Sequence, residues 1–204
     1  FKEWSMSVMA FSQMMGNLKN VESNLELARA KYSAEGASRV GGSVAMTGAA
    51  INSFTLSSIW ESADACFAAR GTVLADPEMQ AAITASEGRP LGFMIGDLKT
   101  ELGQCEGTFA VAVGATTTDH SDDAVAAVAG HYERLFVANG VNGVRTVRLN
   151  AAGEFTGAYA NIFYTDTLDA YFNASAAAWG DTDFLATSAK IGATIVDRTI
   201  SRMV

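Results

Sequence analysis

Apolar residues alternate with small ones in short segments of the chain and repeat with helical spacing in longer ones. Phe109, Val111 and Val113 alternate with small residues, which is the two-residue period of a strand. Residues 125–136 then place apolar side chains at i, i+3, i+4 and i+7 after Ser121, a residue type that caps helix N-termini. This part of the chain is therefore predicted to form a strand followed by an amphipathic helix.

The same reasoning gives each half of the chain the order β-α-β-β-α-β. In the second half, we expect strands at 108–116, 144–149, 157–165 and 192–203, one helix between Ser121 and Asn139, and another at 168–178 that continues with a break through 184–190. In the first half, we expect strands at 4–14, 39–46, 51–59 and 91–100, one helix between Asn17 and Gly36, and another at 63–74.

The two halves also resemble each other in sequence. The matches are Asp64–Ala69 with Asp169–Ala174 at an offset of 105 residues, Val40 with Val144 at 104, and Leu91-Gly92 with Ile191-Gly192 at 100. The last match places Asp97 over Asp197. Segments that recur in the same order at nearly the same offset indicate an internal repeat. We therefore predict two domains, 1–104 and 105–204, each a ferredoxin-like repeat.

The third strand of each half is predicted to carry apolar residues on both faces. In the first half, Phe54, Leu56 and Trp60 share one face, and Ile51 and Ile59 share the other. An antiparallel sheet with one face in water reads apolar on one side and polar on the other. We therefore expect an α+β fold in which helices cover one face of each sheet and the two repeats pack sheet to sheet.

Each half has an acidic strand end, then a helix, then a short acidic break, in residues 60–64 through 75–79 and residues 164–166 through 180–184. With the β-α-β-β-α-β order, this resembles the dimeric α+β barrel superfamily, which includes the antibiotic-biosynthesis-monooxygenase-like, EthD-like and NIPSNAP-like families. Most members are homodimers of one such unit, so the resemblance implies a fused pseudo-dimer within one chain. Members include cofactor-free monooxygenases, haem enzymes, and small isomerases or lyases, and fold alone does not choose among them.

Some members of this superfamily bind haem, so the resemblance raises the question of whether this chain has a haem ligand. Haem-degrading members place an axial His near the end of a unit's second helix, but residues 63–83 and 168–190 contain no His. Fused haem-peroxidase-like members place it on a helix of the second half, where His131 is predicted to lie on the first helix. Cys66 and Cys105 form neither a disulfide framework nor a zinc motif. We therefore expect no haem, no metal and no other cofactor.

The composition narrows the choice of partner. Lys and Arg number 14 against 22 Asp and Glu, which gives a net charge of −8 at pH 7. Nucleic acids and anionic lipids attract basic surfaces, so we expect neither as a partner. The chain has no stretch of 18 apolar residues and no signal-peptide pattern at its start, so we expect no membrane span and a cytoplasmic location. A small apolar molecule and a second copy of the chain are the expected partners.

Arg145, Arg148 and His131 are the first candidates for chemistry. The two arginines are three residues apart in a strand, so they point to opposite faces. One should then point into the barrel or its mouth, where it could bind a carboxylate or enolate. The alternatives are a buried pair with an acid such as Asp197 and a charge at the strand edge. For His131, the alternatives are proton transfer and a hydrogen bond to the backbone.

The polar and aromatic residues of the third strands are the second group. Cofactor-free monooxygenases of the superfamily use Asn, Trp and Tyr to hold a polyphenolic substrate. The resemblance therefore implies that Asn161, Tyr159 and Trp60 bind substrate, and Tyr164 becomes a candidate for proton transfer. The alternative is an ordinary aromatic core. Asn161 aligns with Leu56, so such a site would exist in the second half only.

Two functions remain open. The first is a metal-free enzyme, monooxygenase-like or isomerase-like, that acts on an apolar oxygen-bearing small molecule. In it, Arg145 or Arg148 would stabilise an enolate, and His131 or Tyr164 would move a proton. The second is a non-catalytic module for ligand binding or assembly. An enzyme should have a pocket of roughly 300–1,000 Å³ with converging polar groups, whereas an assembly module should have a solid interior and an exposed apolar patch.

Overall fold

The computed structural model describes residues 7–204, which divide into two compact units. Unit 1 holds the described residues up to Leu98 together with 149–156 and 203–204, and unit 2 holds 99–148 and 157–202. Residues 4–6 of the first predicted strand lie outside the described residues. The described part of the chain contains eight strands and six α-helices, which confirms the α+β class.

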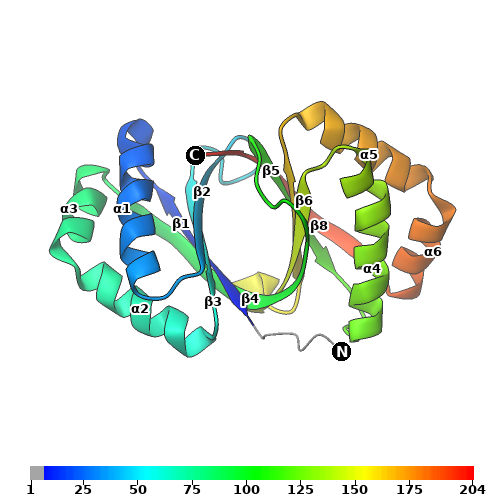
Figure 1. Cartoon of the computed structure of the whole chain (residues 1–204), viewed down its shortest axis with the longest axis horizontal. Coiled ribbons are helices and arrows are strands. Elements are labelled where there is room, and N and C mark those ends of the chain that lie inside the picture. The colour runs from blue at the N-terminus through cyan, green and yellow to red at the C-terminus, as the bar shows by residue number, and fades with distance from the viewer. Residues whose placement is uncertain (1–6) are drawn as a thin grey trace. The chain divides into compact units, whose positions relative to one another are not determined.

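Unit 1 is a four-stranded antiparallel sheet with helices on one face (Figure 1). Its elements are β1 (Val8–Met15), α1 (Val21–Ala34), β2 (Arg39–Ala45), β3 (Phe54–Trp60), α2 (Ala63–Ala75), α3 (Pro77–Ala85) and β4 (Arg89–Gly103), with a 3₁₀ turn at Leu18–Asn20. The strand order is β4-β1-β3-β2. The far end of β4 passes into unit 2, because the division falls after Leu98.

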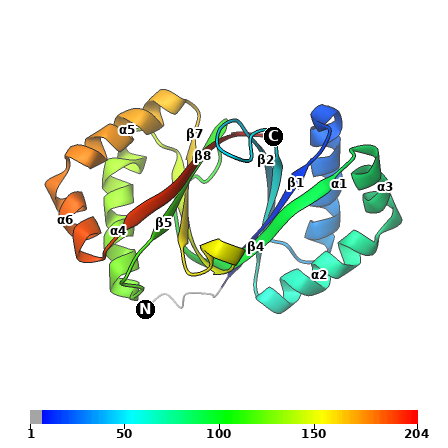
Figure 2. The ribbon, with the colours of Figure 1, turned by 180° about the vertical axis from the view of Figure 1, so that it is seen from behind.

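Unit 2 has the same kind of sheet, with strand order β8-β5-β7-β6. Its elements are β5 (Phe109–Thr116), α4 (Asp122–Leu135), β6 (Gly143–Ala151), β7 (Tyr159–Thr165), α5 (Leu168–Gly180), α6 (Thr182–Lys190) and β8 (Thr194–Met203), with 3₁₀ turns at Val137–Asn139 and Gly153–Phe155. Figure 2 shows α4, α5 and α6 gathered on one side of these strands.

The last four elements of the two units keep a constant spacing in the chain. β7, α5, α6 and β8 each begin 105 residues after β3, α2, α3 and β4, at 159 and 54, 168 and 63, 182 and 77, and 194 and 89. Each last strand also contains a bulge at the same step. Leu91 is the extra residue where β4 pairs with β1, and Val196 is the extra residue where β8 pairs with β5.

The predicted match of the last strands at an offset of 100 residues is wrong. Gly92 lies within β4, whereas Gly192 follows α6 with a φ of +65° in the left-handed region that glycine tolerates. With the observed spacing, Asp97 corresponds to Arg202 and not to Asp197. The two similar dipeptides therefore have different structures, one in a strand and the other at the end of a helix.

Asp76 and Asp181 form the acidic breaks between the paired helices. As N-caps do, Asp76 accepts hydrogen bonds from two backbone N–H groups at the start of α3, and Asp181 accepts one from the backbone N–H of Phe184 in α6. A cation from the first helix of the unit binds each one, with Lys31 Nζ 2.8 Å from Asp76 Oδ2 and Arg134 Nη1 2.7 Å from Asp181 Oδ2. The cation and these N–H groups hold the pKa of both carboxyls below the usual range.

Each unit buries an apolar core between its helices and its sheet. In unit 1, Trp60 is 1% exposed, its ring meets Tyr32 edge to face at 5.9 Å, and its Nε1 donates to Ser58 Oγ at 2.8 Å. In unit 2, Phe163 and Tyr171 are equally buried. Ile51, expected within the third strand, lies in the turn before β3 and is 50% exposed. No helix among residues 7–204 has the length and apolar character needed to cross a bilayer.

Candidate functional site

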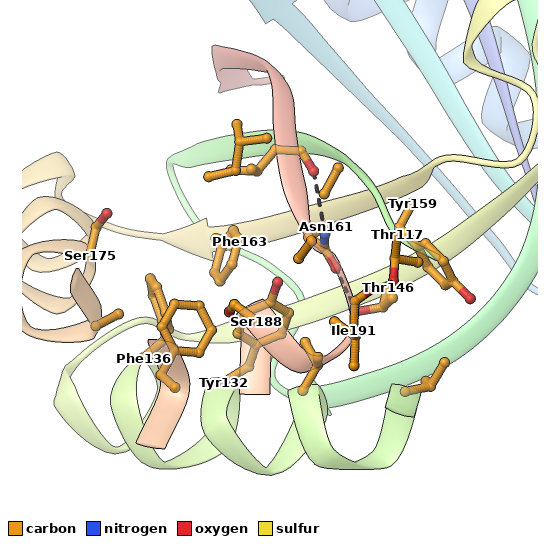
Figure 3. A pocket seen from close by; sticks show the side chains of 18 of the residues that line it. Thr117, Tyr132, Phe136, Thr146, Tyr159, Asn161, Phe163, Ser175, Ser188 and Ile191 are labelled. Atoms are coloured by element: carbon orange, nitrogen blue, oxygen red, sulfur yellow. Dashed lines mark hydrogen bonds between the residues drawn. The ribbon is translucent and has the colours of Figure 1, made fainter. Parts of the chain in front are cut away.

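A cavity of about 210 Å³ lies in unit 2 between the three helices and the sheet (Figure 3). It is smaller than the pockets of roughly 300–1,000 Å³ that hold drug-sized ligands. Its wall is largely apolar and includes several aromatic rings, which come from α4, β7, α5 and α6 and the turn after α4. They are Tyr132, Phe136, Tyr159, Phe163, Tyr171, Trp179 and Phe184. Trp179 is 55% exposed, so this ring stands at the mouth of the cavity.

A buried polar pair lies within this largely apolar wall. Thr146 on β6 and Asn161 on β7 are direct cross-strand partners, and the Thr146 hydroxyl donates to Asn161 Oδ1 at 3.1 Å. Asn161 Nδ2 donates one hydrogen bond to the Val113 carbonyl at 3.4 Å, as the dashed lines in Figure 3 show. An amide nitrogen carries two N–H bonds. The second can therefore donate to an oxygen atom of a bound molecule.

Two phenols add donors to the wall. Burial raises the pKa of Tyr132 and of Tyr171, so both side chains stay protonated at neutral pH. Arg198 and Ser175 act on Tyr171 in the opposite direction, and the Arg198 guanidinium lies 6.0 Å from the centre of its ring. Protonated phenols donate hydrogen bonds to oxygen, and they do not serve as bases.

A polar edge closes the cavity near the start of α4. Asp119 lines the wall, and its carboxylate accepts a hydrogen bond from the backbone N–H of Ser121 at 2.9 Å. This hydrogen bond holds the pKa of Asp119 below the usual range, so the group is ionised at neutral pH. His120, which is exposed, stacks on Tyr159 with ring centres 5.8 Å apart and planes 20° apart.

Arg145 and Tyr164 lie on the sheet face opposite the helices. Each neighbours a cavity residue in sequence, Thr146 or Phe163, and successive strand residues point to opposite faces. Arg145 is 6% exposed; its Nη1 donates to Tyr164 Oη at 3.0 Å and its Nε to Glu101 Oε2 at 2.9 Å. The ion pair of Arg145 is thus with Glu101, and neither residue belongs to the cavity wall.

The other predicted site residues also lie apart from the cavity wall. Arg148 is half-buried on β6, and Trp60 belongs to the core of unit 1. His131 Nδ1 is 3.1 Å from Arg134 Nη2, which can only donate, so Nδ1 is the acceptor. His131 Nε2 then carries the proton and donates to Thr187 Oγ1 at 2.9 Å. Among the predicted residues, the cavity brings together Asn161 and Tyr159 only.

Sequence reasoning missed several residues of this wall. Tyr132 belonged to the apolar stripe predicted for the helix, and Tyr171 lay inside the repeated Asp64-type motif, yet neither was singled out. Thr146 lies between Arg145 and Arg148, the two arginines that were predicted to be catalytic. The alternation of side chains along a strand was one usable signal. Tyr159 and Tyr164 are separated by an odd number of residues, so their side chains lie on opposite faces of the sheet.

The superfamily that the sequence resembles includes haem enzymes, but the residues of this cavity do not suit haem. The described residues that line it include no His, Cys or Met, which are the usual axial donors. Tyrosine also ligates haem in some proteins, but burial keeps Tyr132 and Tyr171 protonated. No cluster of three or more His, Cys, Asp or Glu side chains arranged to hold a metal ion occurs within residues 7–204.

Known proteins resemble this chain in fold but not in sequence. No family model and no curated protein sequence matches it. Solved structures match over nearly the full length: a variant of chlorite dismutase from Candidatus Nitrospira defluvii has a TM-score of 0.63 and 10% identity, covering 98% of this chain and 92% of that one. A proposed monooxygenase from Lactobacillus acidophilus NCFM has a TM-score of 0.59 and 9% identity, covering 98% and 93%.

An anthrone oxidase-like protein also matches, with a TM-score of 0.58 and 11% identity, covering 98% of this chain and 92% of that one. All three proteins belong to the dimeric α+β barrel superfamily. At this level of identity the likeness extends to the fold alone, and the substrate must be argued from the cavity itself.

Proposed function

We propose that unit 2 binds a small, apolar, oxygen-bearing molecule in its cavity and acts on it as a metal-free enzyme of monooxygenase or isomerase type. The observation that carries this proposal is the Thr146–Asn161 pair, a buried hydrogen-bonded polar pair inside a largely apolar wall. Buried polar groups in a ligand pocket orient the ligand, while the apolar wall supplies most of the contact area.

The wall favours loss of a proton from an enol or phenol of the substrate. The second Asn161 N–H and the Tyr171 phenol are positioned in the wall as donors for the oxygen on which negative charge develops. Asp119 is the one carboxylate among the described lining residues, so we assign it the role of proton acceptor. In the monooxygenase case the resulting anion transfers electrons to dioxygen. In the isomerase case the proton is delivered to a carbon of the anion, which converts the enol to its keto tautomer.

These assignments change the roles given to the predicted catalytic residues. Arg145 and Tyr164 form a hydrogen-bonded pair on the other face of the sheet, and His131 donates to Thr187 beside the cavity. We therefore propose Asn161 and Tyr159 as substrate-binding residues, with Asp119 and Tyr171 taking the catalytic roles.

The test uses an exchange that the chain itself provides. Leu56 stands in unit 1 where Asn161 stands in unit 2, so Asn161→Leu replaces the amide by the residue of the matching wall. Binding of 1-naphthol and naphthalene should be compared by ligand-observed NMR. The protein should prefer 1-naphthol by about fivefold or more, as one hydrogen bond allows, and Asn161→Leu should remove the preference. Equal binding of both probes to the unaltered protein would contradict the proposal.

A second candidate function is binding without catalysis. The raised pKa of Tyr132 and Tyr171 and the lowered pKa of Asp119 favour it, because none of these groups is then poised near neutral pH to exchange a proton. An oxygen electrode and mass spectrometry of 1-naphthol after incubation separate the two functions. Oxygen uptake with a product 14 mass units heavier supports oxidation, because one oxygen atom then enters the substrate and the other leaves as water with two substrate hydrogens. Unchanged 1-naphthol supports binding alone.

We further propose that the chain is a fused tandem repeat, with 1–104 and 105–204 as its ferredoxin-like repeats and the sheets packed face to face. The constant spacing of elements, the matched bulges and the matched acidic breaks support the repeat. A cytoplasmic location and self-association into a homo-oligomer stay predictions. Native mass spectrometry of the purified protein measures the oligomeric state and any ligand that copurifies.

A further inference from the structure

Unit 1 contains a second cavity, of about 260 Å³, built from the corresponding elements of that unit. Side chains from β1, α1, β3, α2, α3 and β4 line it. Most of the wall is apolar, and Phe54, Leu56, Leu74, Met79 and Ile83 form its hydrophobic part. This cavity is no smaller than the one in unit 2, so its chemistry has to be considered separately.

Arg70 is the one charged residue among the described residues that line this second cavity, and no Asp or Glu faces it there. The Arg70 guanidinium lies 4.5 Å from the centre of the Phe93 ring. A ring face attracts a cation but carries no negative charge to neutralise it. Within residues 7–204, Arg70 forms no ion pair, although Lys31, Arg134 and Arg145 each have a carboxylate within 3 Å.

Tyr32 brings a neutral donor to the same part of the wall. Its side chain is buried on α1 and packs edge to face against Trp60, which fixes the ring. Burial raises the pKa of Tyr32, and the nearby charge of Arg70 works against that rise, which places the two groups within electrostatic reach. A cation and a protonated phenol thus share one wall of an otherwise apolar cavity.

We propose that the unit 1 cavity binds a small organic acid, with its carboxylate paired to Arg70 and its hydrocarbon part among Leu56, Leu74 and Met79. An arginine offers two parallel N–H donors that match the two oxygens of a carboxylate. An apolar cavity holding one cation suits one negative charge, because a second charge on the ligand would be buried without a partner. This site is independent of the function proposed for unit 2 and uses none of its residues.

The experiment titrates the whole chain with benzoate at pH 7 and compares it with benzamide, which has the same ring without the charge. Binding is followed by ligand-observed NMR. We expect the protein to bind benzoate at least tenfold more tightly than benzamide, as a charge-assisted hydrogen bond allows. Arg70→Gln should weaken benzoate binding by about tenfold or more and leave benzamide binding unchanged.

Two further variants keep the test decisive. Arg198→Gln removes the arginine of the other cavity and should leave benzoate binding intact. Met79→Trp fills the unit 1 cavity and should weaken both probes while Arg70 keeps its charge. Circular dichroism establishes that each variant is folded, and Arg70→Met, which also removes the charge, replaces Arg70→Gln if that variant does not fold. The proposal is overturned if benzoate binds Arg70→Gln as tightly as the unaltered protein, or if Arg198→Gln abolishes benzoate binding.

Discussion

Corresponding elements surround the cavities of unit 1 and unit 2, but one cross-strand pair of residues differs in polarity between the two units. In unit 2, Thr146 and Asn161 face each other across β6 and β7 and are joined by a hydrogen bond. In unit 1, Gly42 and Leu56 occupy the corresponding pair across β2 and β3. The missing side chain of Gly42 leaves room that Leu25 and Phe54 fill, since a Cβ there would lie within 3.0 Å of both. At this position hydrocarbon side chains pack together in unit 1, whereas a hydrogen-bonded polar pair stands in unit 2.

The arginines of the two cavities differ in a related way. Arg70 reaches from α2 over Phe93 on β4, whereas Arg198 reaches from β8 over Tyr171 on α5. At the common spacing of 105 residues, Arg198 stands where unit 1 has Phe93. The cation and the aromatic ring have therefore exchanged elements while remaining neighbours. The fold therefore accepts the arginine either on the helix, with the ring on the strand, or on the strand, with the ring on the helix. The choice decides whether the helix side or the sheet side of the cavity wall carries the charge.

The largest effect on stability is expected from changing Leu56, the unit 1 residue that corresponds to Asn161. Leu56→Asn places an amide in the hydrocarbon wall of unit 1, where Gly42 offers no side chain as partner. We expect the free energy of unfolding to fall by about 3–4 kcal/mol, from lost apolar burial and an unpaired polar group. Urea denaturation measures it. The matched variant Asn161→Leu should cost less, about 1–2 kcal/mol, because leucine packs well there but the buried Thr146 hydroxyl loses its acceptor. Equal costs would mean that the two walls do not differ as described.

Arg145 offers the next largest effect, because unit 1 has Gly41 at the corresponding position of β2. Arg145→Met removes the donors to Glu101 and Tyr164, and the phenol is then buried without this partner. We expect a loss of about 2–3 kcal/mol of unfolding free energy, as for hydrogen bonds that involve a charged group. Urea denaturation is again the measurement, and Arg148→Met on the same strand is the control. A loss no larger than in the control would show that the buried pair contributes nothing.

Gly42 itself tests how tightly the unit 1 wall is packed. Gly42→Ala adds a methyl group that would approach Phe54 Cε2 to 2.8 Å and Leu25 Cδ2 to 2.9 Å. Overpacking of this kind costs about 1–2 kcal/mol, which thermal unfolding would detect. Gly41→Ala is a matched control, because a Cβ at Gly41 meets only Ser57 Oγ, at 3.4 Å. If both variants unfold at the same temperature, the wall of unit 1 is looser than its geometry indicates.

The smallest effect concerns the helix breaks and depends on pH. The folded-state pKa of Asp181 is lowered, so its contribution to stability is present above the unfolded value of about 3.9 and is lost as the pH falls through the folded value. Asp181→Asn should therefore lower the Tm at pH 7 and flatten its dependence on pH below about 5. Asp76→Asn should act in the same direction with a smaller change, because Arg134 binds Asp181 through two nitrogens and Lys31 offers one. Thermal scans between pH 3 and pH 7 would reveal any reversal of this order.

The order of elements was predictable because it rests on local physics. Ser121 caps α4 by accepting from Ala124 N, as its position before two acidic residues indicated, and the alternation of Phe109 and Val111 placed β5. The pairing of the last strands was not predictable from such signals. Gly92 and Gly192 occupy similar dipeptides, but only hydrogen bonds to neighbouring segments distinguish a strand glycine from one that ends a helix.

The candidate site was predictable only in part. Asn161 and Tyr159 share a face of β7, and alternation along the strand sufficed to place them together. Alternation also separates Arg145 from Arg148, but it does not tell which of the two faces carries the helices. Arg70 escaped notice because a single arginine in a helix resembles a solvated charge. Arg70 becomes a candidate ligand-binding residue only because the cavity wall contains no Asp or Glu among its described residues. Five other elements contribute to that wall, so this property cannot be read from the helix alone.

The bulges at Leu91 and Val196 have a consequence for how the mouths of the two cavities can evolve. Pro90 and Ile195 lie beyond the bulges and face the cavities because they pair with Met14 and Ala115. Deleting Leu91 or Val196 would therefore restore regular pairing and leave every other residue of the strand on its present face. The rim of each cavity can thus gain or lose one residue in length while the side chains that meet a ligand stay in place.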